Sequence, residues 1–260
     1  MKKLLTIAAM TLAASSVAAQ PLFPNSVVSN DIDFITTDDH SAFYCLHYLG
    51  TDRREMPDKR HDELFADGVH VFEALFTDGT VIEITAHPDF GTEARAADVA
   101  AKLTGPLGRL PTFMREKLGH VVLQKGDETA FAESRGRFFT VYDENMSKRI
   151  GTHDLEETVF HESVHAAMDV PVATDPEWLA AQSDDAAFVT EYAASLPERE
   201  DLAETALFAY AFFRHPERLD DQLLRDIKQT IPNRLAYLER FFGPSLTLQH
   251  EQDGLPACPD

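Results

Sequence analysis

The stretch DLEETVFHESVHAAMD, residues 154–169, contains the most informative pattern in the chain. Asp154 precedes a run without proline or glycine, and Glu157 stands at the third helical position, as in a reciprocally capped helix start. At about 100° per residue, the polar side chains fall on one side and the apolar side chains cover the rest. The polar stripe consists of Thr158, His161, Glu162, His165 and Asp169. We therefore expect a helix over 154–168 whose apolar face packs against the rest of the protein and whose polar stripe is left uncovered.

The spacing within this stripe is typical of a zinc site. His161 and His165 are one helical turn apart, so both imidazoles can reach one tetrahedral zinc ion at about 2.0–2.1 Å. Glu162 is angled to meet a zinc-bound water instead of the metal. Zinc lowers the pKa of that water towards about 7, and Glu162 can take its proton as hydroxide attacks a polarised carbonyl. The pattern indicates one Zn²⁺ per chain and peptide-bond hydrolysis.

A catalytic zinc usually has three protein ligands and keeps one position open for water. His165 is followed by Ala-Ala-Met-Asp-Val-Pro, without the nearby third histidine of a metzincin. The third ligand is therefore expected to be a carboxylate further along the chain. On spacing alone, four acids qualify, although acids at a helix start are also common without any metal. These acids are Glu191, Glu200, Asp201 and Glu204.

Residues 154–214 resemble the gluzincins related to the catalytic domain of anthrax lethal factor and to the bacterial Pro-Pro endopeptidases. They also look like a set of uncharacterised secreted bacterial zinc peptidases. In this group an HExxH helix is followed by a tyrosine and then by a Glu-x-x-x-Glu helix whose first glutamate binds zinc. The resemblance implies a zincin-like fold, with Glu162 as general base. The implied zinc ligands are His161, His165 and Glu200.

The resemblance also implies roles for residues around the metal. Tyr192 would donate a hydrogen bond to the developing oxyanion, and Glu204 would orient a ligand histidine. Tyr192 precedes Glu200 by one residue more than in those relatives. Tyr192 therefore has a second interpretation, as a packing or surface aromatic. Asp169, one turn beyond His165, is either another orienting partner or an ordinary acid at a helix C-terminus.

The rest of the chain predicts an α+β protein. Two β-rich runs, 69–76 and 81–85, flank Asp78-Gly79, a strong hairpin signal. We expect strands also at 120–123 and 137–142, and a loop at 143–153. Residues 42–49 form a short apolar patch that the pattern leaves unassigned. The expected helices, apart from the one carrying the motif, are 93–103, 111–118, 184–195, 197–214, 216–230 and 232–242. The helical C-terminal half thus follows an N-terminal sheet.

The first twenty residues resemble a bacterial secretory signal. Lys2 and Lys3 precede an apolar run that is too short to span a bilayer, and Val17-Ala18-Ala19 follows as a small-residue cleavage site. We expect a signal peptide over 1–19, an N-terminal wrap over 20–66, a metallopeptidase domain over 67–247 and a tail over 248–260. The predicted location is the periplasm or the medium.

Composition narrows the range of partners. The chain has 44 acidic and 23 basic residues and a formal net charge of −21, which argues against nucleic acid and anionic membranes as partners. A peptide or protein substrate remains the expected partner. Cys45 and Cys258 can form a disulfide in an oxidising compartment if the two ends of the chain are neighbours, and are separate thiols otherwise.

Two other classes of function are compatible with the motif. The chain can be a zinc-binding protein that binds peptides or assists assembly without cutting, or a non-catalytic exported domain in which HExxH occurs by chance. The presence of Glu162 favours hydrolysis over pure binding, because a binder does not need a base.

Overall fold

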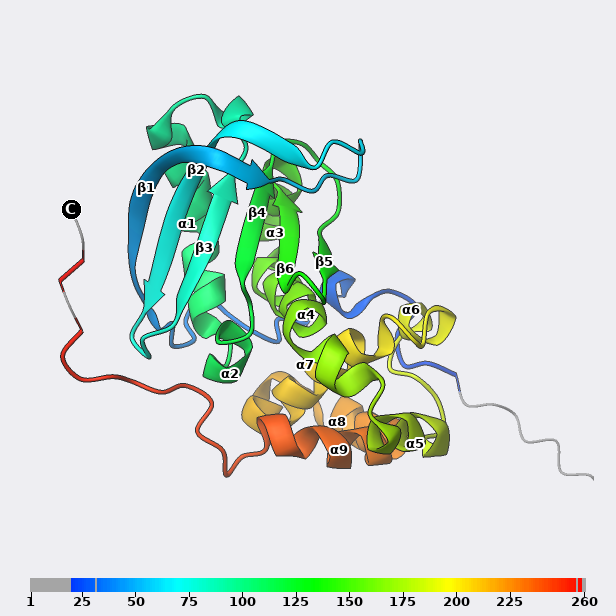
Figure 1. The fold of residues 1–260 in the computed structure, drawn as a ribbon. Helices are drawn as coiled ribbons and strands as arrows, with labels where there is room; N and C mark the ends of the chain where they lie inside the picture. Colours follow the sequence, from blue (N-terminus) through cyan, green and yellow to red (C-terminus); the bar gives the residue numbers. More distant parts are fainter. Residues whose placement is uncertain (1–19, 31, 256, 259–260) are drawn as a thin grey trace, which may run out of the picture.

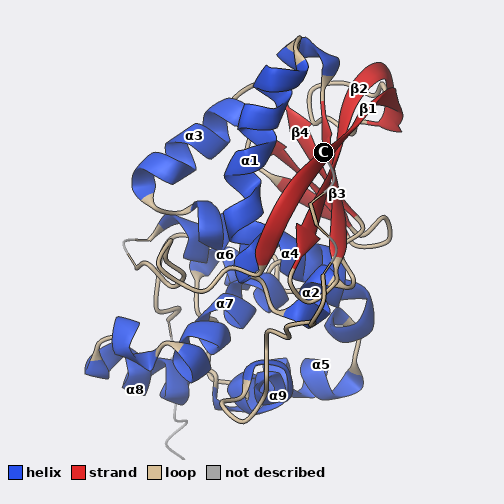
Figure 2. Cartoon of the chain, turned by 90° about the vertical axis from the view of Figure 1, so that its left-hand side faces the viewer, coloured by secondary structure: helices blue, strands red, loops and turns tan. Residues whose placement is uncertain are grey.

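The computed structural model describes residues 20–30, 32–255 and 257–258. The chain is an α+β protein in which a six-stranded mixed sheet is covered by helices on one face (Figures 1 and 2). Further helices gather beyond one end of the sheet (Figure 1). The predicted signal segment, residues 1–19, lies outside the described residues. Among the described residues, no helix has the length and apolar character needed to cross a membrane.

The sheet has the strand order β1-β2-β3-β4-β6-β5. The β3–β4 and β4–β6 pairs are parallel and the other pairs are antiparallel. Its hairpin at Asp78-Gly79 is confirmed: the Asp78 carboxylate accepts from the Thr80 amide at 3.0 Å, and Gly79 adopts a φ of 82°. The strands expected from the sequence all occur, and β1 and β5 add an edge at either side. The strands are β1 (Phe43–Glu55), β2 (Phe65–Phe76), β3 (Val81–Ala86), β4 (His120–Gln124), β5 (Phe131–Glu133) and β6 (Phe138–Tyr142).

The helices form two groups. The group that packs on the sheet contains α1 (Glu93–Arg109), α3 (Asp143–Thr152) and α4 (Leu155–Met168), with the short α2 (Thr112–Arg115) following α1. A π-helical turn, η3 (Asp169–Ala173), continues α4. The C-terminal group contains α5 (Pro176–Asp184), α6 (Glu191–Ser195), α7 (Asp201–Arg214), α8 (Asp221–Thr230) and α9 (Pro232–Phe242). Short 3-10 turns are η1 (Val27–Ser29), η2 (Pro88–Phe90) and η4 (Pro216–Arg218).

Two expectations for the N-terminal half were wrong. The helix expected over 93–103 continues through Pro106 to Arg109, because Leu103 and Leu107 lie on the same buried face. Burial of such side chains offsets the cost of an internal proline. The segment 143–153 is helix α3 instead of a loop. This helix is polar because it lies at the surface with a single fully buried side chain, so its composition resembles that of a loop.

The C-terminal half begins and ends its helices at different places from those expected. Within the predicted helix 184–195, only the last residue of α5 and the short α6 are helical, and an irregular segment lies between them. The break follows from long-range bonds: the Asp185 carboxylate accepts from the Arg234 side chain at 2.9 Å and from the Asn233 amide at 2.8 Å. Similarly, α7 begins at Asp201 instead of residue 197. The expected helix 216–230 is interrupted before α8, where the Asp220 side chain accepts from the Leu223 amide at 2.7 Å.

The two ends of the described chain are bound to the central fold. Phe23 pairs with the segment before α6, since its amide donates to the Val189 carbonyl at 3.0 Å. Residues 43–55, inside the predicted wrap, form strand β1 of the same sheet. In the predicted tail, Cys258 forms a disulfide with Cys45 of β1, with the two Cα atoms 5.9 Å apart.

Glu157 does not cap α4 as the sequence suggested. The Asp154 side chain makes no cap bond either and accepts from the Thr152 hydroxyl at 2.5 Å. Glu157 instead accepts from the Ile35 amide at 2.9 Å, and its second oxygen is buried without a hydrogen-bond partner. Burial raises the pKa of the Glu157 carboxyl to about 8, against the lowering effect of the Ile35 amide. The neighbouring acids Glu156 and Asp154 raise the pKa further.

Glu157→Gln is expected to change the dependence of stability on pH. Above pH 4.5, the ordinary pKa of a glutamate, the unfolded chain releases the Glu157 proton, whereas the folded protein keeps it up to about pH 8. The contribution of Glu157 to the free energy of unfolding is therefore fully present below pH 4.5 and is lost as pH rises through about 8. The shift corresponds to a penalty of about 5 kcal/mol at high pH. Urea unfolding of metal-free protein should give similar stability for wild type and variant at low pH and a more stable variant at high pH. Equal stability at both would contradict a buried neutral Glu157.

Candidate metal centre

Helix α4 presents the HExxH motif to a cleft because its other sides are covered. The sheet and α1 lie on one side of α4 and α7 lies on the other. Phe160 and Val164 are fully buried in the core between these elements. The cleft has a volume of about 710 Å³. It is lined by the β5 region, by α4 with η3, and by the segment that leads into α7.

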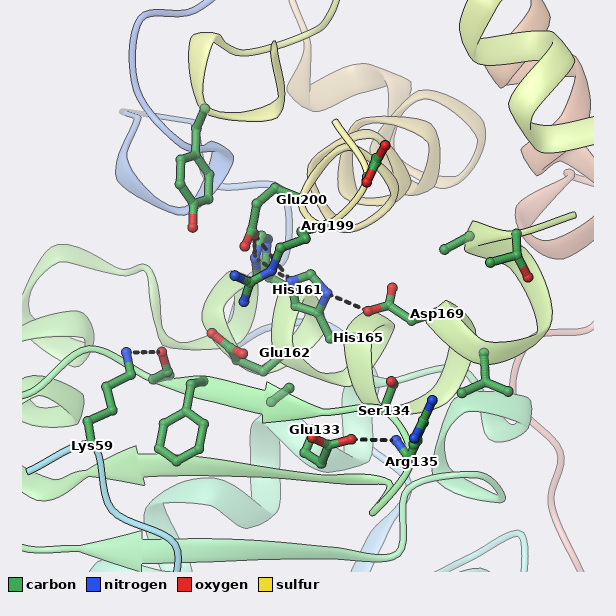
Figure 3. Close-up of a pocket in the computed structure, with 18 residues that line it drawn as sticks. Lys59, Glu133, Ser134, Arg135, His161, Glu162, His165, Asp169, Arg199 and Glu200 are labelled. Atoms are coloured by element: carbon green, nitrogen blue, oxygen red, sulfur yellow. Dashed lines mark hydrogen bonds and ion pairs between the residues drawn. The ribbon is translucent and has the colours of Figure 1, made fainter. Parts of the chain in front are cut away.

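Three side chains from α4 and the start of α7 meet in this cleft (Figure 3). The Nε2 atoms of His161 and His165 are 3.2 Å apart. The Glu200 Oε2 atom lies 3.5 Å from Nε2 of His161 and 3.3 Å from Nε2 of His165. Two nitrogen atoms and one carboxylate oxygen therefore form a nearly equilateral triangle.

The triangle fits one face of a tetrahedral zinc site. With zinc–ligand bonds of about 2.0–2.1 Å, the ligand atoms of a tetrahedron lie about 3.3–3.4 Å apart. The three separations in the structure, 3.2, 3.3 and 3.5 Å, are close to this ideal separation. Two imidazoles and one carboxylate are also a ligand set used by catalytic zinc. The residues present therefore fit a single zinc ion with a fourth position facing the cleft.

A carboxylate lies behind each imidazole, and the one behind His165 is within hydrogen-bond distance. His165 Nδ1 lies 3.0 Å from Asp169 Oδ2, and His161 Nδ1 lies 3.6 Å from Glu204 Oε1. Asp169 favours a proton on Nδ1 of His165, and in the neutral imidazole the lone pair of Nε2 is then free for a cation held between the three side chains. Burial acts to lower the pKa of His165, but Asp169 and Glu200 outweigh it and raise the pKa to about 10. The same negative field favours a metal cation.

The four candidate acids occupy different environments. Glu200 alone reaches both Nε2 atoms, and hydrogen bonds from the two histidines overcome burial and lower its carboxyl pKa well below the usual range. Asp201 points away from the cleft and binds Arg234 at 2.6 Å and Gln182 at 2.8 Å. Glu191 is exposed at the start of α6 and does not line the cleft.

Glu204, the fourth acid, is fully buried one turn beyond Glu200. Its carboxylate accepts from the Ser26 hydroxyl at 2.5 Å, the Val27 amide at 2.7 Å and the Thr190 hydroxyl at 2.8 Å. The N-terminal segment thus fixes the carboxylate that faces His161. Sequence patterns could not reveal these partners, because Ser26 and Glu204 are separated by 178 residues.

Glu162 and Tyr192 line the same cleft. Glu162 points toward the cleft from α4 (Figure 3), and burial raises the pKa of its carboxyl, although the two motif histidines act in the opposite direction. Tyr192 enters from α6 and is partly exposed. Burial and then the Glu200 carboxylate raise the pKa of Tyr192 to about 12, so its phenol remains a hydrogen-bond donor at neutral pH. The cleft therefore contains one candidate base and one candidate donor beside the three candidate ligands.

Comparisons with protein-family models, with curated proteins and with solved structures gave no match to this chain.

Proposed function

We propose that the chain is a zinc-dependent peptidase with a zincin-like fold of the gluzincin type. The observation that carries this proposal is the triangle of His161, His165 and Glu200, whose dimensions suit zinc, with Glu162 beside it in an open cleft. Bound zinc supplies Lewis acidity, which lowers the pKa of water and polarises a carbonyl group.

Side chains of the protein carry out proton transfer, stabilise the developing negative charge and orient the ligands. Glu162 takes the proton of the attacking water and later passes it to the leaving amine. Tyr192 donates a hydrogen bond to the oxygen of the carbonyl as negative charge develops there. Asp169 holds the imidazole of His165 in orientation from behind, and the Glu204 carboxylate lies 3.6 Å behind the imidazole of His161. The arrangement supports hydrolysis of an extended peptide that lies along the cleft.

We also propose that the protein acts after export, in the periplasm or the medium. The disulfide between Cys45 and Cys258 supports this, because such bonds persist in oxidising compartments. The signal-like sequence at residues 1–19 supports it independently.

The proposal is tested by peptide hydrolysis. Protein supplied with zinc is incubated with a complex mixture of peptides, and new termini are identified by mass spectrometry. We expect new termini that disappear after chelation and return when zinc is restored. Absence of new termini with zinc-bound protein would favour the alternative, a zinc-binding protein that holds peptides without cutting them.

Tyr192→Phe is expected to lower kcat by about a hundredfold, with KM and zinc content little changed. The substitution removes only the phenolic oxygen, and loss of one oxyanion donor has about this effect. Steady-state kinetics with one identified peptide, together with zinc analysis, measure the change. An unchanged kcat would mean that Tyr192 is only a packing aromatic of α6.

A further inference from the structure

The cleft contains cationic side chains that the protein itself does not neutralise. Arg135 and Arg199 both line it, and neither guanidinium makes an ion pair or hydrogen bond with the described residues. Most other arginines have acidic partners, as expected in a chain with 44 acidic and 23 basic residues. These paired arginines are Arg53, Arg54, Arg60, Arg109, Arg115, Arg149, Arg218, Arg234 and Arg240. The two free guanidinium groups of the cleft are therefore available to a ligand.

The cations lie on opposite walls of the cleft. Arg199 directly precedes the ligand Glu200, whereas Arg135 follows β5 on the side of the sheet (Figure 3). Lys59 joins Arg135 on the sheet side, where its ammonium binds the Thr129 hydroxyl at 2.9 Å and the Ala130 carbonyl at 3.1 Å. A peptide that crosses the metal centre passes between these walls.

Two further acids line the cleft without neutralising these cations. One oxygen of Glu133 accepts from the backbone amide of Arg135 at 2.9 Å, and this bond shapes the turn after β5. Glu198 is exposed and makes no ion pair with the described residues. Neither carboxylate lies within ion-pair distance of Arg135 or Arg199. Among the described residues, no carboxylate that lines the cleft forms an ion pair with either guanidinium group.

We propose that the cleft selects acidic peptides, with Arg199 and Arg135 as specificity residues that bind carboxylates on either side of the scissile bond. This inference rests on the proposed peptidase function. Arginine binds a carboxylate through two parallel N–H bonds, which gives both strength and orientation. The net charge of −21 repels acidic peptides from most of the surface, so local cations in the cleft direct them to the site. The carboxylate belongs to an Asp or Glu side chain or to the C-terminus of the peptide.

Binding to the zinc-loaded Glu162→Gln protein tests the inference without consuming the peptide. Fluorescence anisotropy compares peptides that carry Glu or Gln beside the scissile bond, each with a free or an amidated C-terminus. We expect the acidic peptide to bind about tenfold more tightly, since a hydrogen bond to a charged group has about that value. The preference should weaken as salt is raised. The free and amidated forms distinguish a side-chain carboxylate from a terminal one.

Arginine variants in the same background assign the effect to the cleft. Arg199→Gln and Arg135→Gln should each weaken binding of the acidic peptide severalfold more than binding of the neutral peptide. Arg137→Gln is the matched control, because Arg137 also lacks an acidic partner among the described residues but does not line the cleft. Arg199→Glu should shift the preference toward a Lys-containing peptide.

The outcomes separate this inference from the function on which it rests. Peptide hydrolysis by the wild-type protein with equal use of acidic and neutral peptides would overturn the inference and leave the peptidase standing. The same holds if the arginine variants behave like Arg137→Gln. Failure to bind or hydrolyse any peptide would contradict both proposals.

Discussion

Glu162→Gln is expected to lower the rate of peptide hydrolysis by about 10²–10⁴-fold, which is the usual effect of losing a general base. The variant should still bind about one zinc ion per chain. Glutamine has nearly the same shape as glutamate but cannot accept the proton of the attacking water. Glu162 is separate from the triangle of ligand atoms, so its replacement leaves the metal site intact. Turnover of one identified peptide and zinc content are measured on the same preparation.

Glu191→Gln provides the matched control for this experiment. It makes the same chemical change at an exposed glutamate outside the cleft, and both activity and zinc should be retained. Near-normal hydrolysis by Glu162→Gln would contradict the mechanism. Loss of zinc together with activity in this variant would instead make Glu162 a ligand.

Glu200→Ala and Asp201→Ala are expected to change different properties of the protein, although the two residues are neighbours. Glu200→Ala removes one of the three ligand atoms, so zinc affinity should fall by orders of magnitude. Asp201→Ala keeps the three candidate ligands but removes one of two buried carboxylates that bind Arg234, which should cost about 1.5–3 kcal/mol of stability. Zinc titration and urea unfolding of the metal-free proteins measure the two effects. A weaker zinc site in Asp201→Ala than in Glu200→Ala would move the third ligand by one residue.

The part of the site that lies on one helix was predictable from the sequence. Residues at i and i+4 of a helix share a face, so the local pattern alone brings His161 and His165 together. The position of Asp169, one turn further on, follows from the same geometry. Such local relations do not depend on the rest of the fold.

Long-range relations needed the structure. Spacing alone left four acids open as the third ligand, and the fold separates them because Asp201 turns toward Arg234 while Glu200 faces the histidines. The contact between Ser26 and Glu204 joins the N-terminal segment to α7 and has no local signal.

The secondary structure, too, was predictable only where it depends on residues close together in the sequence. The hairpin at Asp78-Gly79 was predictable because a short turn specifies it. Helix α3 was missed because its polar surface resembles a loop, and the break before α6 depends on the bond between Asp185 and Arg234. Local propensity is overridden where such tertiary contacts are made.

The most direct test of the metal centre is elemental analysis of the purified protein beside the double variant His161→Ala/His165→Ala. Both are supplied with zinc and then freed of unbound metal, and a circular dichroism spectrum checks that the variant is folded. We predict about one zinc ion per chain in the wild-type protein and none in the folded variant. No zinc in the wild-type protein, or equal zinc in both, would contradict the metal centre and with it the proposed peptidase.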